Sequence, residues 1–282
     1  MKEPNRLVRE LTRLRARSGR ALAPFVTAGD GGLDVTLAVL RALAKCDGVA
    51  CVELGLPFSD PIADGPLLQG AASRALAAGT TFDGVLEMLM RFRRGSDGKL
   101  GSDLPLAIMS YANPLVRRGF DRALPALARA GADALLVPDM PVEEAGSMEA
   151  HAQQCGLAPI FFVAPTTSPT RMASAIAHSQ GFVYAIGRFG VTGAATELDD
   201  GAQEFLARVR SAAKSLPVAV GFGIATPEHV SAATKHADLA IVGSALVEHI
   251  HRAVVGAPDR RLEAASAAAQ ELVHSLSTGL PR

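Results

Sequence analysis

The sequence predicts a single (β/α)₈ barrel of the TIM-barrel class, and three observations support this fold. Short apolar runs typical of strands alternate with helical patterns along the chain, as in a parallel sheet. Most of these runs are apolar throughout, as expected for parallel strands buried on both faces. Eight such units in 282 residues suit a closed barrel. A doubly wound open sheet is the alternative, but no GxGxxG motif follows the first strand.

The expected strands are residues 21–28, 49–56, 105–111, 134–138, 159–164, 182–186, 218–221 and 239–242. The helices between them carry start signals. Asp34 precedes the apolar run 35–46, and either Thr81 or Asp83 caps the run 84–94. Thr226 is followed by Pro227, which places a proline in the first turn of the next helix.

Two further helices are expected outside the eight units. The first 20 residues form an amphipathic pattern that we expect to cover the bottom of the barrel. The alanine-rich run 262–276 is expected to pack on the outside. No linker interrupts the pattern, so we expect one domain over residues 1–282.

Composition excludes several classes of protein. Lysine plus arginine number 28, as do aspartate plus glutamate, and this balance disfavours binding to nucleic acid or to an anionic membrane. No apolar stretch reaches the roughly 18 residues that span a bilayer, and no signal peptide is apparent, so we expect a cytoplasmic protein. The three cysteines lack metal-ligand spacing and are expected to be buried reduced thiols. The seven histidines fall in helical patterns, so no metal site is expected.

Two carboxylates are the leading candidates for chemistry. Barrel enzymes place their sites at the carboxyl ends of the strands. Glu53 interrupts an apolar strand there, and burial would raise its pKa and suit it to proton transfer. A merely hydrogen-bonded carboxylate inside the barrel is an equal alternative. Asp64 follows in a long loop, and both it and Asp60 could simply be turn-forming residues. The presence of two carboxylates, Glu53 and Asp64, on one rim of the barrel favours acid–base chemistry.

A phosphate site is expected at the ends of the last strands. Gly193, Gly223 and Gly243 follow three successive strands, and Ser244 opens a helix. Backbone N–H groups and a helix N-terminus at these loops are the usual phosphate site of barrels. Helix caps and tight turns would explain any single glycine equally well.

Sequence motifs that occur in order along nearly the whole chain carry a family resemblance. They are PFVTAGD (24–30), ELGLPFSDPIADGP (53–66), MSYANP (109–114), PDMPVEE (138–144), GVTG (190–193), GFGI (221–224) and GSAL (243–246). With these motifs the chain resembles the tryptophan synthase α subunit family. The resemblance implies a lyase that cleaves indole-3-glycerol phosphate to indole and glyceraldehyde 3-phosphate.

The resemblance also implies roles for particular residues. Glu53 would move protons between the indole C3 carbon and the substrate hydroxyl, and Asp64 would stabilise positive charge at the indole nitrogen. Other implied substrate contacts are Phe25, Tyr111, Tyr184 and Phe222 around the indole, Gly193, Gly223, Gly243 and Ser244 around the phosphate, and Thr192 as a latch to Asp64.

The family implies a partner and mobile loops as well. A separate β subunit, which carries pyridoxal phosphate (PLP), would take up the indole in an α₂β₂ tetramer, while this chain itself needs no cofactor. Residues 57–64 and 188–197 would be lids. Gly187 stands where the family commonly has serine, which puts lid ordering in question.

Three alternatives remain open. A stand-alone lyase that releases free indole would share every catalytic residue. A catalytically silent modulator of a β subunit would not need both carboxylates. A different phosphate-binding barrel, such as an isomerase, would not need the segment 53–66.

Overall fold

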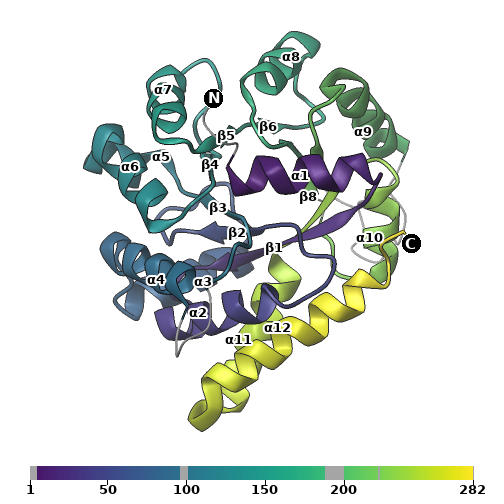
Figure 1. Cartoon of the computed structure of the whole chain (residues 1–282). Helices are drawn as coiled ribbons and strands as arrows, with labels where there is room; N and C mark the ends of the chain where they lie inside the picture. Colours follow the sequence, from purple (N-terminus) through teal and green to yellow (C-terminus); the bar gives the residue numbers. More distant parts are fainter. Residues whose placement is uncertain (1–4, 96–100, 188–199, 222, 282) are drawn as a thin grey trace.

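The computed structural model describes residues 5–95, 101–187, 200–221 and 223–281. Within them, nine parallel strands form one nearly closed barrel surrounded by helices (Figure 1). The strands are β1 (Ala21–Thr27), β2 (Val52–Gly55), β3 (Leu106–Met109), β4 (Ala134–Leu136), β5 (Ala158–Ile160), β6 (Phe162–Val163), β7 (Val183–Ile186), β8 (Val218–Gly221) and β9 (Leu239–Val242). Their order around the sheet is β5-β4-β3-β2-β1-β9-β8-β7-β6. The predicted barrel is confirmed.

The expected strand 159–164 differs from the structure, because it is divided into β5 and β6. β5 pairs with β4, whereas β6 pairs with β7. Phe161 lies between the two, and its carbonyl oxygen accepts a hydrogen bond of 3.0 Å from the Tyr184 N–H. One continuous segment therefore borders both ends of the sheet and brings the barrel close to closure.

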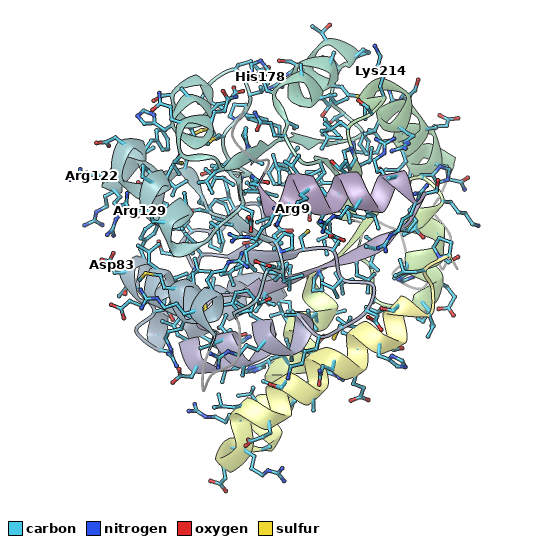
Figure 2. The ribbon with its side chains drawn as sticks, viewed as in Figure 1. Arg9, Asp83, Arg122, Arg129, His178 and Lys214 are labelled. Carbon is cyan, nitrogen blue, oxygen red and sulfur yellow. The ribbon has the colours of Figure 1, made fainter. Side chains whose placement is uncertain are left out.

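The helices follow the strands and form the outer layer. They are α1 (Arg6–Ala16), α2 (Leu33–Leu43), α3 (Pro66–Ala77), α4 (Phe82–Arg94), α5 (Ala112–Arg118), α6 (Phe120–Ala130), α7 (Gly146–Cys155), α8 (Pro169–His178), α9 (Asp200–Ala213), α10 (Pro227–Thr234), α11 (Ser244–Gly256) and α12 (Arg261–Ser277), with a 3₁₀ turn η1 (Pro258–Arg260). Charged side chains such as Asp83, Arg122 and Lys214 lie on the outside of this layer (Figure 2).

The expected helix starts are partly confirmed. The side chain of Thr81 caps α4 by accepting from the Gly84 N–H, and Thr226 caps α10 in the same way. Asp34 is not a cap, because α2 already begins at Leu33 and Asp34 lies in its first turn. There its negative charge still favours the helix by facing the positive end of the dipole.

Two apolar cores result from the alternation of side chains along each strand. Val26, Leu54 and Ile108 point outward and pack against the helices. Phe25, Met109 and Ile241 point into the barrel and form a second core. Both faces of β1 to β5 are buried, which explains why these strand sequences are apolar throughout.

Helix α1 closes one end of the inner core, as expected (Figure 1). Leu7, Leu11 and Leu14 recur at helical spacing and pack beneath the barrel. Asp133, directly before β4, is 2% exposed and forms an ion pair of 2.9 Å with Arg6 of this helix. The same helix is therefore held by apolar contacts and by charge.

A second aspartate repeats this arrangement across the barrel. Asp238, directly before β9, is 1% exposed and accepts a hydrogen bond of 2.9 Å from the Val218 N–H. Arg210 bonds it at 2.6 Å, and Arg15 of α1 lies 4.0 Å away. Three strands separate β4 from β9 in the sheet, so α1 connects two distant parts of the barrel.

The expectation of buried thiols is wrong for two of the three cysteines. Only Cys51 is buried, whereas Cys46, in the turn after α2, and Cys155, the last residue of α7, are partly exposed. In the described part of the chain, no helix is long and apolar enough to cross a membrane.

Candidate active site

A cavity of about 450 Å³ lies at the carboxyl ends of the strands. It receives side chains from β1, β2, β3, β6, β7 and β9, and further residues from the segments that follow β2, β4, β8 and β9. Of the residues expected at the site, the following line it: Phe25, Glu53, Asp64, Tyr184, Gly223, Gly243 and Ser244. The barrel therefore brings together residues that lie up to 219 positions apart in the sequence.

Glu53 forms part of the cavity wall. It stands on β2 in register with Phe25 of β1 and is only 5% exposed. Burial, reinforced by the nearby charge of Asp64, raises the pKa of Glu53 to about 8, although the Tyr184 hydroxyl counteracts the shift. Its Oε2 atom has no hydrogen-bond partner among the described residues, so one lone-pair side is available to a ligand.

The loop after β2 separates Asp64 from Asp60. Asp64 lines the cavity and is half-buried, and burial raises its pKa against the opposing effect of a hydrogen bond from Tyr111. Asp60 is exposed and pairs with the neighbouring Ser59 hydroxyl. Only Asp64 of these two aspartates therefore has access to a bound ligand in the cavity.

Two glycines make room for the aromatic wall. A Cβ atom on Gly55 would lie 2.5 Å from the Phe25 ring, and one on Gly221 would lie 2.8 Å from the Tyr184 hydroxyl. Both distances are too short for real side chains, so each ring lies directly against a glycine. Phe162 tilts against Tyr184 with ring centroids 4.9 Å apart. A flat aromatic ligand fits between such walls.

The opposite end of the cavity is made of backbone. α11 begins at Ser244, directly after Gly243, and its first turn carries N–H groups without partners within the helix. Gly223 has a φ of +77°, a conformation that glycine adopts without strain. A helix N-terminus beside glycine-rich backbone suits an anion. One carboxylate, Glu248, also lines this end and is paired with Arg252.

The remaining expected contacts have different outcomes. Thr192, Gly193 and Phe222 lie outside the described residues, as does the whole of the expected second lid, 188–197. Tyr111 is described but is not among the residues that line the cavity; instead its hydroxyl bonds the loop that carries Asp64.

Several lining residues escaped the sequence reasoning: Leu68, Met109, Pro138, Phe162, Ile186 and Ile241. Most are apolar residues on strands or directly after them, where they look like any other core residue. The alternation of side chains along strands could have found Met109. Gly55 lies two positions after Glu53 and so shares its face of the sheet, and Met109 pairs with Gly55 on the next strand.

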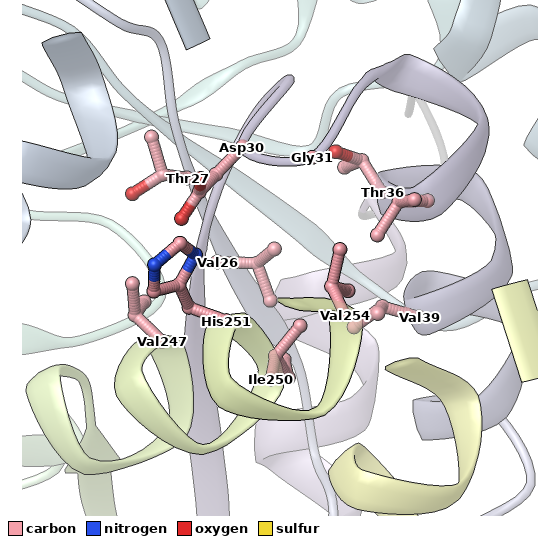
Figure 3. A pocket seen from close by; sticks show the side chains of 11 residues that line it. Val26, Thr27, Asp30, Gly31, Thr36, Val39, Val247, Ile250, His251 and Val254 are labelled. Carbon is pink, nitrogen blue, oxygen red and sulfur yellow. The ribbon is translucent and has the colours of Figure 1, made fainter. Parts of the chain in front are cut away.

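A second, far smaller cavity lies outside the barrel wall. Its volume is about 20 Å³, and it is enclosed by β1, α2 and α11. Val26, Val39 and Ile250 form its apolar side, while Asp30 and His251 stand at its polar edge (Figure 3). This space holds about one water molecule and does not reach either candidate carboxylate.

No metal centre is evident in the part of the chain that the structure describes, since no three His, Cys, Asp or Glu side chains gather there in a suitable group. The chemistry that the cavity offers is that of two carboxylates in unlike environments. One is buried and protonated near neutral pH, and the other is partly solvated.

Comparisons with known proteins agree with this site. The family model described as tryptophan synthase alpha chain matches residues 11–277. A tryptophan synthase alpha chain from Gluconacetobacter diazotrophicus is 45% identical over 243 residues, 86% of each chain. One from Thermosynechococcus vestitus is 43% identical over 94% of this chain and 95% of its own.

Solved structures give the same result. Tryptophan synthase subunit alpha from Legionella pneumophila superposes with a TM-score of 0.81 and 34% identity, covering 98% of this chain and 99% of that one. A chain of the tryptophan synthase complex from Pyrococcus furiosus superposes with a TM-score of 0.79 and 33% identity, covering 92% of this chain and 98% of that one.

Proposed function

Because the chain belongs to the tryptophan synthase alpha chain family, whose activity is that of a lyase, we propose that it cleaves indole-3-glycerol phosphate into indole and glyceraldehyde 3-phosphate. The observation that carries this proposal is the pair Glu53 and Asp64. One is a buried carboxyl with a pKa of about 8 and the other is half-buried, and both face one cavity. The reaction needs a proton donor at carbon and a counter-charge at nitrogen, and this pair supplies both.

Glu53 acts first as an acid and then as a base. Its carboxyl group is mostly protonated at neutral pH and donates its proton to the indole C3 carbon, which leaves positive charge at the ring nitrogen. The resulting Glu53 carboxylate then removes the proton from the substrate hydroxyl. The bond between C3 and the glycerol carbon breaks, its electron pair returns to the indole ring, and an aldehyde forms. Glu53 ends protonated, as it began.

Asp64 stabilises the positive charge on the indole ring in the intermediate state, since it lies in the same cavity. Phe25 and Tyr184 enclose the ring, and Gly223, Gly243 and Ser244 hold the phosphate through backbone N–H groups. Thr192, Gly193 and Phe222 remain proposed contacts from the family resemblance alone.

We further propose that the chain works with a PLP-dependent β subunit that consumes the indole, and that it needs no cofactor itself. Support comes from a structural neighbour with a TM-score of 0.81 and 34% identity, a chain of the mutually activated tryptophan synthase α₂β₂ complex of Pyrococcus furiosus. Organisation as one domain over residues 1–282 and a cytoplasmic location both remain predictions.

A stand-alone lyase is the second candidate. It rests on the same carboxylates and the same cavity, so the site does not separate it from the subunit. Indole release by the isolated chain, measured with and without the β subunit of the same organism, distinguishes the two. Full turnover without any gain from the β subunit would favour the stand-alone enzyme.

An indole-release assay with purified protein and indole-3-glycerol phosphate tests the proposal. Glu53→Gln is expected to lower kcat by roughly three orders of magnitude or more, because no proton donor remains at C3. Asp64→Asn is expected to lose most activity as well. Asp60→Asn is the matched control and is expected to stay within about twofold of wild type, because Asp60 is exposed and outside the cavity.

Two results would contradict the assignment. Near-wild-type turnover by Glu53→Gln would overturn the acid–base mechanism. Greater sensitivity at Asp60 than at Asp64 would show that the wrong aspartate of the loop has been chosen. Unfolding curves for each variant exclude loss of the fold as the cause.

A further inference from the structure

The chain has only two tyrosines, and each lies beside a different one of the two carboxylates. The Tyr184 hydroxyl lies within hydrogen-bonding reach of Glu53, and the Tyr111 hydroxyl lies within reach of Asp64. Tyr184 lines the cavity, so it also meets whatever the cavity holds. Tyr111 does not line it, and its position therefore calls for a different role.

Tyr111 is fixed in place before it reaches Asp64. It lies between β3 and α5, is 2% exposed, and its ring stacks on Phe58 with centroids 5.4 Å apart. A buried, stacked ring loses little further freedom when its hydroxyl forms hydrogen bonds. The hydroxyl is thus presented to the β2–α3 loop by a rigid support.

The Tyr111 hydroxyl faces two adjacent residues of that loop. It accepts from the Ala63 N–H at 3.0 Å, and it lies within reach of the Asp64 carboxyl group, to which it is the donor. Asp64 is also held through its backbone, since its N–H donates to the Pro61 carbonyl at 3.1 Å and its carbonyl accepts from the Gln69 side chain at 3.0 Å. Tyr111 adds the contact that orients the side chain itself.

We propose that Tyr111 is a positioning residue that orients the Asp64 carboxylate and keeps it ionised, rather than a substrate contact. This inference rests on the proposed function and deepens it. A phenol that donates to a carboxylate favours the ionised form. The effect opposes the rise in the pKa of Asp64 that burial causes. An ionised, oriented Asp64 is what the positive indole nitrogen requires.

The hydroxyl is suited to remain a donor. Burial and the adjacent Asp64 charge raise the pKa of Tyr111 well above its usual value, so it stays protonated throughout the working pH range. Its other lone pair is engaged by the Ala63 N–H, which aligns the O–H bond towards the carboxylate.

Tyr111→Phe tests the inference, because it removes the hydroxyl and keeps the ring that stacks on Phe58. We expect kcat for indole release to fall about tenfold, as is typical for loss of a hydrogen bond to a charged group, while KM stays within about twofold. The acid limb of the kcat/KM profile is expected to move to higher pH by about one unit, because Asp64 then needs a higher pH to ionise.

Ser110→Ala is the matched control. Ser110 is 1% exposed and its hydroxyl donates to the Tyr111 carbonyl at 3.0 Å, so this variant also removes a buried hydroxyl from the same segment. We expect it to change stability without moving kcat or the acid limb. An equal fall in kcat for Ser110→Ala and Tyr111→Phe would overturn the inference, as would a rise in KM with unchanged kcat for Tyr111→Phe.

A second measurement does not depend on turnover. The carboxyl carbon of Asp64, followed by NMR in substrate-free protein labelled with ¹³C-aspartate and assigned with Asp64→Asn, is expected to titrate at higher pH in Tyr111→Phe than in wild type. An unchanged titration overturns the inference even if the chain is an active lyase. Loss of the proposed function would appear differently, as wild-type protein that releases no indole.

Discussion

At Glu53, stability and the proposed catalysis make opposite demands. A carboxyl group buried beside another carboxylate is costly to ionise, and this cost raises its pKa from 4.5 to about 8. The same shift keeps a proton available at neutral pH for donation to carbon. The folded protein must therefore carry a stability loss wherever Glu53 is ionised.

The sign of this loss predicts a pH dependence of stability. Below pH 4.5 Glu53 is protonated in both states, so it contributes no penalty. As pH rises towards 8, only the unfolded state releases the proton, and the free energy of unfolding falls by about 1.4 kcal/mol per pH unit from this group. Glu53→Gln should therefore gain stability relative to wild type between pH 5 and 8, by a few kcal/mol in total.

Urea unfolding at several pH values measures the difference between wild type and Glu53→Gln. Glu87→Gln, at an exposed position of α4, is the control and is expected to show a nearly constant difference. A constant difference for Glu53→Gln as well would contradict the raised pKa.

The two catalytic candidates differ in how readily the sequence alone predicts them. A single charge inside an apolar strand singles out Glu53 without any structure. Asp64 needed the family motif, because Asp60 sits in the same loop with the same chemistry. The bond between Tyr111 and Asp64 was not predictable, since it joins the end of one strand to the loop of another at a separation that only the folded barrel sets.

Among the elements, α1 depends on buried charges at the bottom of the barrel. Asp133 accepts from the Leu106 N–H at 2.9 Å and pairs with Arg6 and Arg93 at the same distance. Asp133 therefore connects the strands β3 and β4 to the helices α1 and α4. Burial raises the pKa of Asp133, although the Leu106 N–H and the two guanidinium groups counteract the rise.

Removal of this aspartate should be far more damaging than removal of a surface one. Asp133→Ala leaves Arg93, only 12% exposed, without its ion-pair partner, and we expect a loss of roughly 3 kcal/mol or more. Asp34→Ala breaks an ion pair of the same length with Arg91, but both side chains are over half exposed. That control should cost about 1 kcal/mol or less. Chemical denaturation measures the free energy of unfolding of both variants. An equal decrease in the two would contradict the proposed contribution of Asp133 to stability.

Element prediction succeeded where one signal dominates and failed where two compete. Apolar runs located every strand position, but the segment 159–164 was not recognised as divided, because its apolar pattern continues through Phe161 while its hydrogen bonds change partner. Helix α3 was not among the helices with a named start signal, and Gly65 before it supplies no capping side chain.

At the scale of the whole molecule, the rim that carries the candidate active site also exposes apolar side chains. Ile62 is 79% exposed in the loop that holds Asp64, and Val116 is 57% exposed on α5, which follows the neighbouring strand β3. A partner that covered this rim would bury both and would cover the cavity mouth at the same time. Catalysis and association would then share one face, which suits transfer of a small apolar product.

This placement predicts which substitutions weaken binding to a tryptophan synthase β subunit of the same organism. Ile62→Asp and Val116→Asp should each raise the Kd about tenfold or more, because a charge would replace an apolar contact at the interface. Val255→Asp is the matched control: Val255 is 65% exposed but lies near the last turn of α11, whose first residue, Ser244, lines the cavity. Its position is therefore about 17 Å further along the helix, towards the opposite end of the barrel. Titration calorimetry gives the three affinities, and circular dichroism checks that each chain is folded. Unchanged affinity in both rim variants, or an equal loss in the control, would place the partner on another face.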